Sequence, residues 1–88
     1  MMRVIGVIRK GDYMVEIYLN WAIYDHPKDY PHNFVVRRWK LGDDGEPIPD
    51  QECHLADSLE EARKHIPLGL HRIPQQPGDD PVIIETWI

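Results

Sequence analysis

The residues best suited to chemistry in this chain are its five histidines and its single cysteine, because imidazole and thiolate groups bind metals and act as bases or nucleophiles. The densest group spans eight residues and offers oxygen and nitrogen ligands: Asp25, His26, Asp29 and His32. A second group adds the thiol: Cys53, His54, His65 and His71. Neither spacing matches the paired ligands of tetrahedral zinc sites. We therefore predict no metal site and no cofactor, and we interpret residues 25–32 as a loop.

Nucleophilic catalysis has little support in the residue inventory. Ser58 is the only serine and Thr86 the only threonine, and Ser58 stands where a helix is predicted to begin. Cys53 precedes His54 directly, but neighbours in an extended segment point to opposite faces, so this imidazole cannot serve as the base for this thiol. The chain also lacks the glycine patterns that cradle phosphates. The sequence therefore predicts a protein that is not an enzyme, without catalytic residues.

Aromatic and basic residues alternate between positions 33 and 41, which suggests stacking on nucleobases as an alternative function. Arg37, Arg38 and Lys40 lie beside Phe34 and Trp39, and single-strand binders combine such groups on a sheet. Two observations oppose this interpretation. The net charge is −5 with a pI near 5.4, and Arg37 and Arg38 point to opposite faces of a strand. Nucleic acid is thus a less favoured partner than protein.

Charge is distributed unevenly along the chain. Residues 1–41 carry seven basic and four acidic side chains, whereas residues 42–88 carry three basic and eleven acidic ones. The two halves either fold against each other or make contacts between copies. Residues 43–61 hold eight acids and no base, which raises a further alternative, an acidic inhibitor or adaptor that binds a basic partner protein.

The stretch from Tyr13 to Leu41 organises the chain, and its first part, from Tyr13 to Tyr24, has the longest alternating pattern. Several of its even positions are polar. Its odd positions from 15 to 23 are apolar: Val15, Ile17, Leu19, Trp21 and Ile23. This period of two predicts a β-strand with one buried face. At about 3.3 Å per residue it would span roughly 40 Å, so we expect it to bend or bulge.

The remaining elements follow from turn and capping signals. Residues 3–9 predict the first arm of a hairpin that turns at Gly11, and residues 33–41 predict a strand antiparallel to the long one, with its inward face unsettled. Residues 51–55 suggest a short edge strand. Asp57 to about Ile66 predicts the helix, capped by an Asp57–Glu60 or Ser58–Glu61 box. Residues 68–73 are a short extended piece, and residues 82–88 predict a closing strand inside the sheet.

These elements predict a single α+β domain over residues 1–88, an antiparallel sheet of about four or five strands with one helix on one face, in the order β-β-β-(β)-α-β. A helix about 15 Å long cannot cover a strand of about 40 Å, so we expect an apolar sheet face that a second copy covers in a homodimer. The short apolar run at Val4–Ile8 argues against a membrane span, and a cytoplasmic location is expected.

The favoured function is a self-associating protein-interaction or regulatory module. The exposed binding surface is predicted to comprise Tyr18, Tyr24, Tyr30, His32 and Arg38.

Overall fold

The computed structural model describes residues 6–10 and 14–88, with side chains described from residue 17 onward. It contains strands β1 (Gly6–Lys10), β2 (Met14–Asp25), β3 (Phe34–Leu41), β4 (Pro47–Ala56), β5 (Arg72–Pro74) and β6 (Ile83–Trp87), and one helix, α1 (Leu59–Arg63). The predicted turn at Gly11 and the inward direction of the Val15 side chain lie outside the described residues. In the described part of the chain, no helix is long and apolar enough to cross a membrane.

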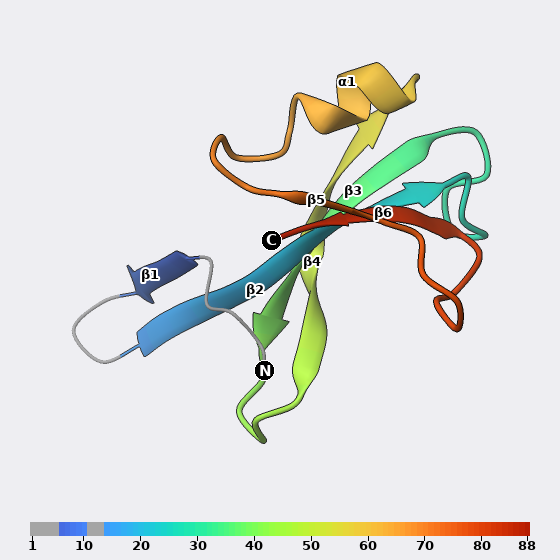
Figure 1. Cartoon of the computed structure of the whole chain (residues 1–88). Coiled ribbons are helices and arrows are strands. Elements are labelled where there is room, and N and C mark those ends of the chain that lie inside the picture. Colours follow the sequence, from blue (N-terminus) through green and yellow to red (C-terminus); the bar gives the residue numbers. More distant parts are fainter. Residues whose placement is uncertain (1–5, 11–13) are drawn as a thin grey trace.

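The strands form one antiparallel sheet in the order β4-β3-β2-β6-β5, and β1 pairs with the N-terminal half of β2. Figure 1 shows this half of β2 projecting with β1 beyond the other strands. The predicted antiparallel sheet is confirmed, and so is the closing strand inside it, since β6 lies between β2 and β5. The predicted element order is wrong because Arg72–Pro74 pairs with β6 as a further strand. With five helical residues, the fold is mostly β.

Strand β2 buries residues on both faces because it bulges at Leu19. Asn20 pairs with Trp39 and Tyr18 with Lys40, so Tyr18 and Asn20 face opposite sides although they are two residues apart. The predicted bulge is therefore confirmed, whereas the prediction of one continuous buried face is wrong. Ala22 is 2% exposed and Ile23 is 0% exposed, although as neighbours in the strand they face opposite sides of the sheet.

The helix begins where the capping signal predicts. Ser58 Oγ accepts a hydrogen bond from the Glu61 amide at 3.1 Å, and Glu61 Oε2 accepts one from the Asp57 amide. These contacts satisfy amide groups that have no partner within the helix. The helix ends earlier than predicted. From Arg63 to Ile66 the chain continues in turns whose hydrogen bonds join residues three positions apart. Pro67 follows and cannot continue an α-helix.

The core between α1 and the sheet defines the helix face of the sheet. Ala62 and Ile66 of the predicted apolar stripe pack against Ile23, Val36 and Ala56, with Leu59, Trp21 and Trp87 around them. Figure 1 shows α1 lying on one side of the sheet beside the end of β4. Tyr18 continues this face beyond the bulge, because its ring lies 5.9 Å from that of Trp21.

The opposite side, which we call the open face, carries Tyr24, Val35 and Arg37, since these residues alternate with Ile23 and Val36. Val35 is 0% exposed and Ala22 is 2% exposed. Side chains and loops of the same chain therefore cover much of this face. Among the residues whose side chains are described, Leu55 stays 45% exposed on this face while Ala22 and Val35 are covered. The exposed apolar area is therefore smaller than expected, and the homodimer stays a prediction.

Candidate functional site

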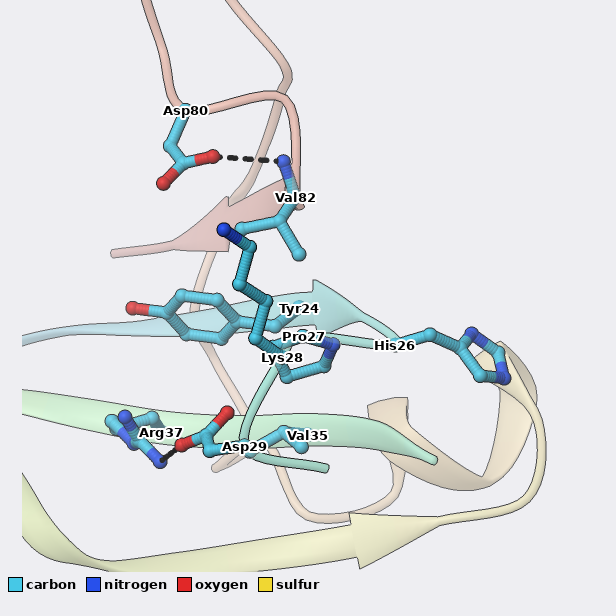
Figure 2. Close-up of a pocket in the computed structure, with 9 residues that line it drawn as sticks. All are labelled: Tyr24, His26, Pro27, Lys28, Asp29, Val35, Arg37, Asp80 and Val82. Carbon is cyan, nitrogen blue, oxygen red and sulfur yellow. Dashed lines mark hydrogen bonds and ion pairs between the residues drawn. The ribbon is translucent and has the colours of Figure 1, made fainter. Parts of the chain in front are cut away.

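A pocket of about 550 Å³ opens on the open face, between the loop after β2 and the loop before β6 (Figure 2). It is lined by Tyr24, His26, Pro27, Lys28, Asp29, Val35, Arg37, Asp80 and Val82. Its volume lies within the range of small-molecule and side-chain pockets, roughly 300–1,000 Å³. It joins residues that are more than fifty positions apart in the sequence, from Tyr24 to Val82.

The floor and one wall of the pocket come from the paired strands β2 and β3. Val35, paired with Tyr24, lies fully buried at the floor. Trp39 Nε1 donates a hydrogen bond to the Tyr24 hydroxyl at 3.0 Å, which fixes the phenol ring. Burial raises the pKa of Tyr24, although the hydrogen bond from Trp39 and the charge of Arg37 oppose this shift. The phenol is therefore neutral at pH 7 and presents an uncharged ring to the pocket.

Arg37 supplies the charged wall. Its guanidinium carbon lies 5.7 Å from the centroid of the Tyr24 ring, a cation–π distance. Its Nη2 donates one hydrogen bond to Asp29 Oδ2 at 3.2 Å. Its Nε is shielded from solvent and has no hydrogen-bond partner. Partial burial works against the charge, but the contacts with Asp29 and with the Cys53 thiol outweigh it and raise the pKa of Arg37, so the cation persists.

The loop that carries Lys28 and Asp29 is held by its own backbone. His26 takes a left-handed conformation with φ of 50°, and its amide donates to the Asn33 carbonyl, which closes the loop. The Tyr30 amide donates to the Pro27 carbonyl at 3.0 Å. The Asp25 amide donates to the Val82 carbonyl at 2.8 Å, which fixes the distance between the two walls.

Lys28 is the second cation of the pocket. Its side chain extends past Tyr24 toward Val82 (Figure 2). No hydrogen bond or ion pair joins it to another residue whose side chain the structure describes. On the opposite wall, Asp80 Oδ1 accepts a hydrogen bond from the Val82 amide at 3.1 Å, which shapes that loop. The pocket thus holds two basic and two acidic side chains, of which Asp29 and Asp80 already serve the protein's own structure.

The five residues predicted for one binding surface lie in different places. Tyr24 lines the pocket. Half-buried Tyr30 lies beside Cys53, and the hydrogen bond with Cys53 is the main cause that raises the pKa of Tyr30. His32 is exposed in the loop. Tyr18 is 3% exposed and lies under Arg38 on the helix face, with the guanidinium carbon 4.2 Å from its ring centroid. Tyr24 and Tyr30 therefore both lie near Arg37 and Asp29, whereas Tyr18 and Arg38 lie on the helix face.

Arg38 is occupied by structural partners. Its Nε donates to Asp50 Oδ2 at 2.6 Å and its Nη2 to Glu52 at 3.4 Å. Partial burial favours the neutral form of Asp50, but the hydrogen bonds from Arg38 and from the Glu52 amide outweigh it and lower the pKa of Asp50. This ion pair joins the basic and acidic halves of the chain. As neighbours in β3, Arg37 and Arg38 lie on different faces of the sheet.

The two histidine groups do not come together as ligand sets. Among residues 17–88, no three His, Cys, Asp or Glu side chains gather closely enough to hold a metal ion. His54 stacks on His65 with centroids 4.4 Å apart, whereas Cys53 lies near Tyr30 and Arg37. The prediction that Cys53 and His54 point to opposite faces is therefore confirmed.

The pocket contains residues that sequence reasoning missed, chiefly Arg37, Lys28 and Asp80. The alternation of residues 33–41 separates Arg37 from Arg38 but does not say which one faces a cavity. Lys28, between two prolines at positions 27 and 31, was the one available signal for a fixed cation in a rigid loop. Asp80 and Val82 reach the site only through the pairing of β6 with β2.

Comparison with known proteins gives no match: no family model, no curated protein and no solved structure matches the chain. The geometry of the pocket therefore carries the functional conclusion by itself. Its residues are suited to binding, because two cations and a neutral phenol surround an apolar floor.

Proposed function

We propose that this protein is a small, non-catalytic binding module that engages a partner protein through the open face of its sheet. The observation that carries the proposal is the pocket, which places Arg37 and Lys28 over the apolar floor at Val35. Leu55 extends this surface along β4, because it pairs with Val35 and is 45% exposed. Exposed apolar residues beside a pocket with a few polar groups are typical of sites that receive a partner's side chain.

A cytoplasmic location belongs to the same proposal. Cys53 is the single cysteine and is free, so the chain gains no internal disulfide from an oxidising compartment.

Self-association is a second candidate, favoured by strand β4. This strand lies at one end of the sheet order and pairs with β3 alone among the described strands. An edge strand offers backbone donors and acceptors to another chain. Pro47 and Pro49 block the first part of β4, so a second copy would pair along Asp50–Ala56.

Photocrosslinking tests both forms of association in one experiment. Leu55 is replaced by p-benzoylphenylalanine on the open face, and exposed Glu60 on α1 is replaced in a matched control. We expect crosslinked products from position 55 and few from position 60. A product of twice the chain mass indicates self-association, and a product with another chain indicates a partner.

A partner captured in this way must also bind as a purified protein. We expect it to bind the wild-type protein at least tenfold more tightly than the Leu55→Arg variant, because the substitution places a charge on the exposed surface. Equal crosslinking from positions 55 and 60, or none from either, contradicts the proposal that the open face is the binding surface.

A further inference from the structure

We propose that the pocket receives a carboxylate joined to an apolar body, with Arg37 and Lys28 holding the carboxylate and Pro27 and Val82 contacting the apolar part. This inference rests on the proposed binding function and names the chemistry of its ligand.

The first step is that Arg37 is underused as a donor. Its guanidinium makes one hydrogen bond, to an Asp29 carboxylate that is itself 53% exposed, besides its contacts with the Cys53 thiol and the Tyr24 ring. Arg63, by contrast, makes two bonds to Glu85, at 2.8 and 2.9 Å. Because Arg37 Nε is shielded from solvent, a ligand reaches this guanidinium through its Nη groups. A carboxylate that reaches this guanidinium supplies acceptors that the protein does not.

The second step is the position of Lys28. Its flexible side chain crosses the pocket beside the Tyr24 ring (Figure 2) without a hydrogen bond or ion pair to a residue whose side chain is described. A lysine ammonium is strongly hydrated and is ordinarily left in open solvent. Here the exposed Lys28 lines a concave site together with a guanidinium, so both cations can contact an anion that enters the pocket.

The third step decides between carboxylate and phosphate. Asp29 and Asp80 also line the pocket and repel an incoming anion, and a dianionic phosphate more strongly than a monoanion. The planar guanidinium fork binds carboxylates and phosphates alike, so the repulsion from the two acids decides between them. A singly charged carboxylate therefore fits the charge balance better than a phosphate ester.

The fourth step is the apolar floor. Val35 forms the closed base of the pocket, and the half-buried Val82 and Pro27 line its wall, where a ligand can contact them. Burying apolar ligand surface here contributes about 25 cal/mol per Å². A carboxylate with an aromatic or aliphatic body thus gains binding free energy from the two cations and from the apolar residues. Acetate gains it from the cations alone.

Calorimetry with 4-phenylbutyrate as the probe tests this proposal, with the neutral 4-phenylbutyramide and phenyl phosphate as comparisons at matched ionic strength. We expect the carboxylate to bind with a Kd on the order of 1 mM, as its size allows. Arg37→Gln is expected to weaken binding about tenfold and Lys28→Gln about threefold. Lys64→Gln, which removes a cation from the exposed end of α1, is expected to leave the Kd unchanged.

A variant that is expected to strengthen binding controls for loss of binding through misfolding. Asp29→Asn removes the carboxylate that competes for Arg37, so it is expected to tighten binding of 4-phenylbutyrate at least twofold. Equal binding of the amide, tighter binding of phenyl phosphate, or no effect of Arg37→Gln overturns the proposal.

The source of the carboxylate is distinguished with peptides. A short peptide ending in phenylalanine with a free terminal carboxylate is compared with its amidated form. Binding of the free peptide at least tenfold tighter than 4-phenylbutyrate identifies a polypeptide terminus, whereas equal binding identifies a free acid. If no carboxylate probe binds but position 55 still crosslinks to a partner, the pocket assignment fails and the proposed function stands.

Discussion

Ile23→Ala is expected to lower the free energy of unfolding by about 3–4 kcal/mol, because it leaves a cavity in the most enclosed part of the core. Ile23 is 0% exposed and packs with Val36 and Ala62 between β2 and α1. For a domain of this length the loss corresponds to a fall in Tm of roughly 15–25 °C. Chemical denaturation and calorimetry of the variant and the wild type measure both quantities.

Two further substitutions make this prediction specific. Leu68→Ala removes the same kind of side chain from a position that is 101% exposed, so it is expected to change stability by less than about 0.5 kcal/mol. Leu19→Ala is expected to cost about 2–3 kcal/mol, although Leu19 lies at the bulge and outside the cluster that contains Ile23. A negligible effect of Leu19→Ala would contradict the finding that the core of β2 extends to the bulge.

Arg63→Leu is expected to lower the free energy of unfolding by about 2–3 kcal/mol, because it breaks the ion pair that anchors α1 to β6. Glu85 is 3% exposed and receives two hydrogen bonds from Arg63 and one from Trp87. Leucine preserves helix propensity and apolar bulk but leaves the buried carboxylate with fewer partners. The figure lies below that of a fully buried pair because the Arg63 side chain is 44% exposed.

The direction of the Glu85 pKa shift predicts how this loss of stability depends on pH. The hydrogen bonds from Arg63 lower the pKa of Glu85, although burial opposes them. Stability from this pair is therefore present above the ordinary glutamate pKa of about 4.3 and is lost as the pH falls through the lower folded value. We expect the wild type and Arg63→Leu to differ most at pH 7 and to converge near pH 3. A difference that is constant from pH 7 to pH 3 would show that Arg63 acts through packing alone.

Local signals predicted much of the fold because they depend on neighbouring residues. The hairpin of β1 and β2, the Ser58–Glu61 cap and the apolar stripe from Leu59 to Ile66 each rest on contacts within a few positions. The inner position of β6 was predicted because four of residues 82–88 are aliphatic and one is tryptophan, which would leave an exposed apolar edge outside the sheet. Each of these features could therefore be predicted from residues that lie close together in the sequence.

The candidate site was harder to predict because long-range pairing creates it. The bulge at Leu19 moves Tyr18 to the helix face, and period alone cannot place a bulge within an apolar run. The same alternation leaves Arg37 and Arg38 equivalent until Asp50 engages Arg38. Asp80 and Val82 then reach the pocket through the antiparallel pairing of β6 with β2.

The most direct test of the binding surface is an NMR titration of the ¹⁵N-labelled wild-type protein with 4-phenylbutyrate. We expect amide shifts concentrated at the residues that enclose the pocket, which are 24–29, 35–37 and 80–82, while the amides of α1 at 59–63 remain in place. Shifts centred on α1, or none at millimolar probe, would contradict the claim that the open face of the sheet is where this protein binds.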